Sequence, residues 1–198
     1  MGKQTKDVSF SKLASSYDEG AAGKASQKFY KLLLREIDLQ LGAKVLDVGC
    51  GTGALLKRLA AKGDMIGYGT DIEENMIREA KQKAPEMKYH IASCDQLPFD
   101  ENTMDAVVAC MAYHHFVSKD GFASETARVL KPGGVLYIVD PRFPWIVRKA
   151  MNGIARLFRV AGEFLTAKEI EARFVGFGFF GIGVAVDMYA QVVILKKK

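Results

Sequence analysis

The sequence predicts an α/β protein with a doubly wound, mostly parallel seven-stranded sheet, helices on both faces and a C-terminal antiparallel strand pair. Two observations carry this prediction. Short β-rich apolar runs alternate with segments of helical periodicity between residues 44 and 140, the pattern of βαβ units in a parallel sheet covered on both faces. Two further β-rich runs, 179–186 and 191–195, then follow each other with no helix between them.

Length and composition describe one globular domain. The chain has 198 residues, of which 49% are apolar and 26% charged, and this balance excludes a disordered chain. No apolar run approaches the roughly 18 residues of a membrane span, and the opening MGKQTK lacks a signal-peptide core. Three cysteines are too few for a disulfide scaffold, so we expect a cytoplasmic protein. The net charge of +5 permits anionic partners without demanding nucleic acid.

Residues 1–41 are expected to form an N-terminal arm and a helix that precede a domain at 42–198. Residues 1–24 are polar and weakly patterned, with one short helix expected near 10–17. From Ala25 to Leu41 apolar positions recur at helical spacing, and Gly42 is a natural stop.

The remaining elements follow from the apolar periodicity and from Gly and Pro punctuation. A capping box at Thr166–Glu169 opens a further helix that Gly176 closes. The five strands of the alternating region are expected at 44–48, 65–71, 87–94, 104–110 and 134–140, and its helices at 54–62, 73–84 and 118–130.

A glycine loop follows the first of these strands. Residues 45–53 read VLDVGCGTG and lie at a strand's carboxyl end, where glycines let the backbone approach a ligand closely. A tight strand–helix turn would need fewer glycines. Gly49, Gly51 and Ala54 also satisfy the dinucleotide pattern G-x-G-x-x-[GA], and Asp71 lies about 20 residues on, where an acid bonds ribose hydroxyls.

Asp47 is the residue that distinguishes a dinucleotide-binding loop from a glycine loop for another ligand. It lies within the strand, two residues before the first glycine, and a buried carboxylate there is costly unless it meets donors or a cation. Residues 47–53 match [DE]-x-G-x-G-x-G at every fixed position. This segment resembles the first motif of class I S-adenosylmethionine (SAM)-dependent methyltransferases, which implies a Rossmann-like fold and a SAM cofactor, with S-adenosylhomocysteine as its product.

The resemblance extends from about residue 44 to residue 140. Segments 69–72, 93–99, 112–116 and 128–134 look like the family's second acidic motif, third motif, "HHF" exit and "RVLKPGG" turn. It implies that Asp71 holds the ribose, Ile72 packs on adenine and Asp95 accepts from the adenine amino group. The full cofactor-binding set it implies is Asp47, Gly49, Cys50, Gly51, Gly53, Asp71, Ile72, Met76, Asp95, Gln96, Cys110 and Tyr17.

Three residues are candidates for catalysis. His114 and His115 follow the fourth strand, and histidine is the usual base near neutral pH; we favour His114 by position. The alternative is that both histidines only start a helix. Segment 10–18 is similar to the F-x-x-[VL]-A-x-x-Y-D opening of quinone-pathway C-methyltransferases, which implies that Tyr17 belongs to a lid over the cofactor. The alternative is a surface tyrosine.

The three cysteines all fall at predicted strand ends. Cys50, Cys94 and Cys110 could form a thiol cluster, but no C-x-x-C spacing supports it. We therefore expect no metal site.

An insertion at 141–165 interrupts the alternation. Its apolar residues fall on one helical stripe, and five cationic residues stand against Glu163 for a local charge of +4. We expect a cap over the acceptor site, with the stripe facing the protein. The alternative is a basic amphipathic helix at 142–165 on a membrane surface. The stripe comprises Ile146, Ala150, Ile154, Leu157, Phe158, Ala161 and Leu165.

The function implied is transfer of a methyl group from SAM to a small lipophilic or aromatic acceptor, by a monomer or homodimer. An RNA or protein methyltransferase is less favoured because there is no N-P-P-[YF] motif and no separate binding domain. An NAD(P)-dependent oxidoreductase conflicts with Asp47 and Asp95. A non-catalytic SAM-binding protein would need a blocked acceptor site.

Overall fold

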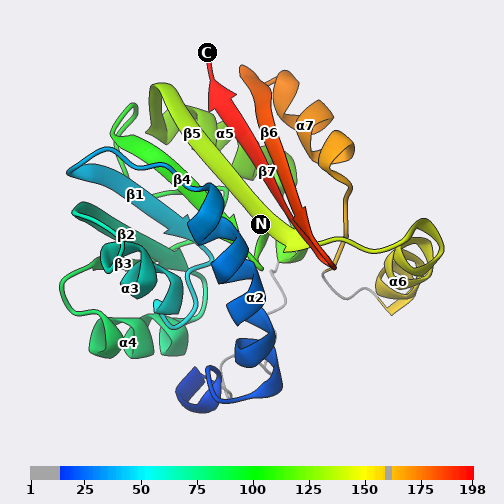
Figure 1. The fold of residues 1–198 in the computed structure, drawn as a ribbon, viewed down its shortest axis with the longest axis horizontal. Coiled ribbons are helices and arrows are strands. Elements are labelled where there is room, and N and C mark those ends of the chain that lie inside the picture. Colours follow the sequence, from blue (N-terminus) through cyan, green and yellow to red (C-terminus); the bar gives the residue numbers. More distant parts are fainter. Residues whose placement is uncertain (1–13, 159–161) are drawn as a thin grey trace.

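The computed structural model describes residues 14–158 and 162–198, and it contains one seven-stranded sheet in the order β3-β2-β1-β4-β5-β7-β6 (Figure 1). The pairs among the first five strands are parallel, whereas β7 pairs antiparallel with both β5 and β6. The predicted fold class, including the C-terminal antiparallel pair, is confirmed. The strands are β1 (Ala43–Val48), β2 (Met65–Asp71), β3 (Lys88–Ile91), β4 (Met104–Cys110), β5 (Leu130–Pro141), β6 (Phe179–Asp187) and β7 (Ala190–Lys197).

Helices cover both faces of the sheet. On one face α2 (Ala21–Glu36), α3 (Ala54–Ala60) and α4 (Glu74–Lys83) bury side chains such as Leu32 and Leu56. On the other face α5 (Lys119–Val129) and α7 (Ala167–Val175) bury Phe122 and Phe174. Two short 3₁₀ turns, η1 (Ala14–Ser16) and η2 (Tyr113–His115), complete the part of the chain that bears on the site.

The first helix differs from its prediction at both ends. It begins at Ala21 and ends at Glu36 instead of spanning 25–41. Ile37 is extended and buried, and the Lys62 ammonium donates to the carbonyls of Leu34 and Ile37. A lysine that follows α3 therefore satisfies one carbonyl in the last turn of the helix and the carbonyl of the residue after it. Of the short helix expected at 10–17, only η1 falls among the described residues.

The insertion forms α6 (Trp145–Phe158), which projects from the sheet edge (Figure 1). The stripe residues Ile146, Ala150, Ile154 and Leu157 are exposed, so the expected packing against the protein is wrong for them, whereas Leu165 packs on the core as expected. The Phe158 side chain and Ala161 lie outside the described part of the chain. The polar side attaches instead: Arg148 pairs with Glu169, and the Asn152 amide bonds both the N–H and the carbonyl of Phe164. Among residues 14–158 and 162–198, no helix is long and apolar enough to cross a membrane.

Candidate functional site

A cavity of about 220 Å³ lies at the carboxyl ends of β1, β2 and β4. In this strand order the crossovers reverse direction between β1 and β4, and ligands of doubly wound sheets bind at such points. Ten of the fourteen predicted site residues line the cavity, namely Tyr17, Asp47, Gly49, Cys50, Gly51, Asp71, Ile72, Met76, Cys110 and His115.

The glycine loop supplies the floor of this cavity and needs its glycines. Gly49 has φ +76°, and a Cβ there would lie 2.6 Å from that of Ala112. Gly51 has φ +52°, and its N–H donates to Asp71 Oδ2 at 2.9 Å. The loop is thus tied to the end of β2, which brings the backbone close to any ligand. Gly53 does not line the cavity; it precedes α3 and lies against Tyr89.

Asp47 is a buried carboxylate with an unsatisfied oxygen. Its side chain projects from β1 into the cavity and its residue is 2% exposed. Within the described part of the chain, Oδ1 has no hydrogen-bond partner. Burial, reinforced by the nearby Asp71 charge, raises the pKa of Asp47 to about 8. Such a group is costly in an apolar interior, and a cation or a donor brought by a ligand would relieve the cost.

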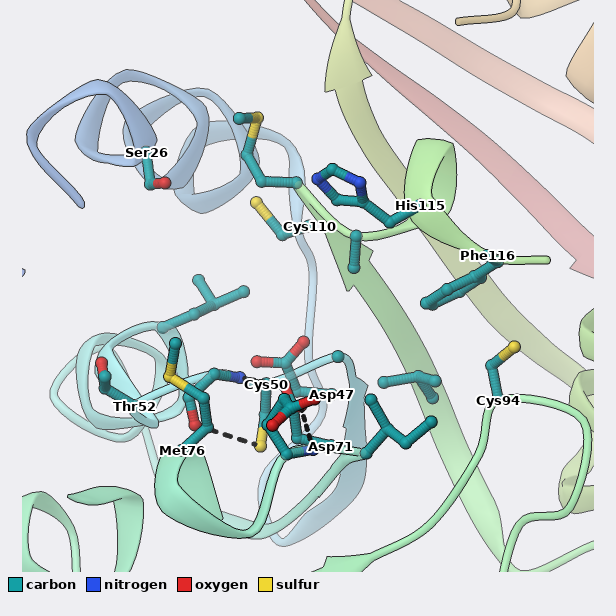
Figure 2. Close-up of a pocket in the computed structure, with 18 of the residues that line it drawn as sticks. Ser26, Asp47, Cys50, Thr52, Asp71, Met76, Cys94, Cys110, His115 and Phe116 are labelled. Atoms are coloured by element: carbon teal, nitrogen blue, oxygen red, sulfur yellow. Dashed lines mark hydrogen bonds between the residues drawn. The ribbon is translucent and has the colours of Figure 1, made fainter. Parts of the chain in front are cut away.

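Asp71 ends β2 beside Asp47 (Figure 2). Its two oxygens accept from the N–H groups of Gly51 and Glu73, each at 2.9 Å. Burial raises the pKa of Asp71 although these bonds act in the opposite direction. An ionised carboxylate has about four acceptor positions, so Asp71 retains capacity for ligand hydroxyls.

The N-terminal arm and α2 form a further wall. Tyr17, Ser26 and Tyr30 line the cavity, and Figure 2 shows Ser26 across it from Asp47 and Asp71. Asp18 attaches the arm: Thr52 Oγ1 donates to its Oδ1 at 2.8 Å, and Lys83 of α4 pairs with its other oxygen. The arm is therefore bonded directly to the glycine loop.

The third motif reaches the cavity through residues other than those predicted. Ser93 and Cys94 line it, whereas Asp95 and Gln96 do not. The Ser93 hydroxyl donates to Asp95 Oδ1. Asp95 thus lies next to Ser93 outside the cavity lining, and its predicted bond to the adenine amino group stays a prediction.

The two adjacent histidines face different surroundings. His115 lines the cavity, opposite the preference for His114. The His114 ring is buried, with Nδ1 2.8 Å from Asp140 Oδ1 at the end of β5, and it stacks on Phe164. The centroids of the two imidazole rings are 4.0 Å apart. His114 therefore supports His115 from behind.

The three cysteine thiols are buried. Burial raises the pKa values of Cys50 and Cys110 well above the ordinary thiol value, so both are protonated near neutral pH. In the described ranges no group of three or more His, Cys, Asp or Glu could hold a metal ion. The thiols act as small apolar groups in the cavity wall.

The structure adds lining residues that the motifs do not reveal. Ser26 and Tyr30 come from one face of α2, and their spacing of four residues on a helix is the signal that could have paired them. Met111, Ala112 and Phe116 make the β4 side apolar. Among the residues that the structure describes, no lysine or arginine lines the cavity, and its acidic residues are Asp47, Asp71 and Glu73. It therefore suits a ligand with a cationic group, hydroxyls and an apolar part, and disfavours a pyrophosphate.

Comparison with known proteins agrees with this chemistry. Residues 46–138 match the model of a family described as methyltransferase domain. The chain is 30% identical over 110 residues to the demethylmenaquinone methyltransferase of Chlorobaculum parvum, covering 56% of this chain and 46% of that protein. It is 29% identical over 145 residues to the ubiquinone/menaquinone biosynthesis C-methyltransferase UbiE of Cupriavidus metallidurans, covering 69% and 60%. The chain thus spans about half the length of these curated relatives.

A solved structure resembles the whole chain. It is a chain of a structure described as the complex between the Haloferax volcanii Trm112 methyltransferase activator and a methyltransferase, with a TM-score of 0.84, 18% identity, and coverage of 98% of this chain and 99% of that one. At this identity the likeness concerns the fold alone.

Proposed function

We propose that this chain, whose residues 46–138 match a methyltransferase-domain family, transfers a methyl group from SAM to a small lipophilic or aromatic acceptor. The observation that carries the proposal is Asp47, a buried carboxyl group whose Oδ1 has no partner, and whose cavity contains no lysine or arginine, among the described residues. SAM brings an ammonium group to such a carboxylate, whereas a dinucleotide brings phosphates that the cavity acids would repel.

The lining residues fit the other parts of SAM. Asp71 would accept from the ribose hydroxyls, and Ile72 and Met76 would pack on adenine, next to Ser93. Asp95 would act through Ser93, to which it is hydrogen-bonded. The glycine loop would lie along the amino-acid end of the ligand, near Asp47.

When bound, SAM supplies an activated methyl group whose C–S electron pair leaves with sulfur as an electron pair of the acceptor forms the new bond to the methyl carbon. The chain then contributes alignment of the acceptor, exclusion of water and removal of any acceptor proton. His115 lines the cavity and would take that proton, with His114 and Asp140 fixing its position.

The arm and α2 would cover the cofactor. Tyr17, Ser26 and Tyr30 close one side of the cavity, and Asp18 bonds the arm to Thr52 in the glycine loop. The acceptor would enter along the side formed by Met111 and Phe116. Because this side is apolar, a lipophilic or aromatic acceptor is preferred to a large polar one. The two relatives compared above are named for quinone methylation, which supports this acceptor class.

A second candidate is a macromolecular acceptor, RNA or protein. The net charge of +5 is compatible with an anionic acceptor such as RNA. The apolar acceptor side favours the small molecule, and the acceptor screen below distinguishes the two.

Calorimetric titration of cofactor-free protein with SAM, S-adenosylhomocysteine and NADH tests the proposal. We expect micromolar binding of the first two and none of NADH, and an Asp71→Ala variant should bind SAM at least about tenfold more weakly, the loss of one or two hydrogen bonds to a charged group. Binding of NADH alone, or unchanged SAM binding by the variant, contradicts the assignment. Methyl transfer from labelled SAM is then screened against quinols, phenols, lipids, RNA and protein extracts.

A further inference from the structure

The outward side of α6 carries the largest concentration of exposed apolar side chains that the insertion offers. Ile146, Ile154 and Leu157 are 72%, 58% and 77% exposed, and Val147 is 45% exposed. Together with Ala150 they occupy one side of the helix, and we call these five residues the α6 apolar face. A surface helix of a globular protein normally turns such a stripe inward.

The rotation of α6 is fixed by its opposite side. Arg148 Nη1 lies 2.8 Å from Glu169 Oε2, and the Asn152 side chain makes bonds of 2.9 and 3.0 Å to the backbone of Phe164. These bonds use the polar residues for attachment to the protein. The α6 apolar face is therefore held away from the body, as Figure 1 shows for the whole helix.

A second element extends this exposed surface. The turn between β6 and β7 presents Met188 and Tyr189, 71% and 62% exposed, and Trp145 at the start of α6 is 61% exposed. The Arg142 N–H donates to the Tyr189 carbonyl at 2.6 Å, which ties the start of the insertion to this turn. Trp and Tyr beside aliphatic residues are typical of surfaces that enter the membrane–water interface.

The charges next to this surface are positive. The described segment of α6 contains no acidic residue. Lys149 is exposed and its ammonium lies 4.6 Å from the Trp145 ring centroid, and Arg142 is exposed as well. The acid nearest in sequence to the turn, Asp187, faces Arg35. An apolar face bordered by cations complements an anionic lipid surface.

We propose that the α6 apolar face and the Met188–Tyr189 turn dock on an anionic lipid bilayer. The helix would lie in the interface, since no helix in the described ranges can cross a membrane. Helix α6 begins four residues after the end of β5. The same end of β5 carries Asp140, which bonds His114 next to the cavity residue His115, so α6 is close in the chain to the site. Docking would place the site near the phase that dissolves a lipophilic acceptor, so this inference rests on the proposed function for its purpose.

Vesicle sedimentation of the full chain tests the proposal without SAM or acceptor. The probes are phosphatidylcholine vesicles with about 30 mol % phosphatidylglycerol and vesicles of phosphatidylcholine alone. We expect binding to the anionic vesicles that weakens with salt. The double variant Ile154→Ser/Leu157→Ser should reduce vesicle affinity at least about tenfold, and Lys149→Glu should reduce it on anionic vesicles only. Leu41→Ser, which changes an 86% exposed side chain elsewhere, is the matched control and should bind normally.

Three outcomes would overturn the proposal. The first is no binding to anionic vesicles, and the second is a loss of binding in the Leu41→Ser control as large as that in the double variant. The third is a dimer in analytical ultracentrifugation that the double variant dissociates, since a second copy of the chain would then cover the α6 apolar face. SAM titration of the same variants separates this result from the proposed function. The double variant should bind SAM as tightly as the unmodified chain, so vesicle binding and cofactor binding fail independently.

Discussion

Replacing Asp47 with Asn should make the ligand-free protein more stable and the SAM complex weaker. The substitution keeps the shape of the side chain and removes its ability to ionise. Asp47 is 2% exposed and its Oδ1 has no partner among the described residues. Its carboxyl therefore costs folding energy in the free protein, and the same carboxyl is the expected partner of a ligand ammonium.

The size of the stabilisation follows from the pKa. Burial first, and the Asp71 charge second, raise the pKa of Asp47 from 3.8 to about 8. Between these values the folded protein holds a proton that the unfolded chain has lost, so stability falls as pH rises through this window. The pKa of 3.8 in the unfolded chain lies about three units below pH 7. At pH 7 the buried carboxyl therefore lowers the free energy of unfolding by up to about 4 kcal/mol. The Asp47→Asn variant would avoid this cost. Its free energy of unfolding should therefore exceed that of the parent most strongly above pH 8, and the difference should vanish below pH 4.

Ligand binding should change in the opposite direction. Removing the buried carboxylate partner of the ligand ammonium should weaken the binding free energy by about 3 kcal/mol, which raises Kd by close to two orders of magnitude. Binding to Asp47 also requires the carboxylate to ionise, so SAM binding at pH 7 should release about 0.9 proton for a group with a pKa of about 8. The Asp47→Asn variant should release none.

Urea unfolding from pH 4 to pH 9 and calorimetry in buffers of different ionisation enthalpy measure these quantities. The control is Asp105→Asn at the opposite end of the sheet. Although burial acts the other way, bonds from Lys131 and from the Lys44 N–H hold the pKa of Asp105 below its ordinary value. This control should not gain stability at pH 7 and should bind SAM normally. An Asp47→Asn variant that is less stable than the parent at pH 8, or that binds SAM with unchanged Kd, would refute the reasoning.

Three further substitutions test other parts of the site. Asp18→Ala removes the bonds from Thr52 and Lys83, and should raise the rate of SAM dissociation several-fold in stopped flow while Asp47-dependent proton release persists. His115→Asn should lower the rate of methyl transfer by about two orders of magnitude if the acceptor loses a proton, with SAM affinity unchanged in calorimetry. An unchanged rate would mean that water, and not His115, takes the proton from the acceptor. His114→Asn should lower the rate of methyl transfer less than His115→Asn does, because His114 lies outside the cavity and contacts His115; a loss larger than that of His115→Asn would reverse the two roles.

The buried centre of the fold is predictable because its local and tertiary signals agree. The observed bounds of β2 and β4 coincide with those expected from the alternation of strand-like and helical segments. The edge strand β3 is shorter than expected, at Lys88–Ile91 instead of 87–94. Beyond Ile91 the chain leaves the sheet, so Ser93 and Cys94 turn into the cavity and Asp95 lies behind them. An alternating pattern does not reveal where pairing with one neighbour ends.

The choice between adjacent histidines depends on contacts distant in sequence. Met111 has φ +56°, and the 3₁₀ turn that follows sends His114 and His115 in different directions. Asp140, 26 residues later, selects His114 for the buried position. The orientation of α6 has the same origin, because Glu169 and Phe164 hold its polar side. Periodicity reveals that a helix has two faces, and the partner determines which one turns inward.

The distribution of charge in the cavity also bears on the order of events. Its acids, Asp47, Asp71 and Glu73, come from the ends of β1 and β2, whereas the β4 side carries Cys110 and Met111. Methyl transfer converts a sulfonium into a neutral thioether, and a carboxylate close to sulfur would stabilise the cation before transfer more than the transition state that follows. Acids confined to the β1–β2 side can hold an ammonium and ribose hydroxyls without this penalty. On the uncharged β4 side no carboxylate among the lining residues stabilises the sulfonium, so its conversion to a neutral thioether is least hindered there. His115 and the proposed acceptor path lie on this same side.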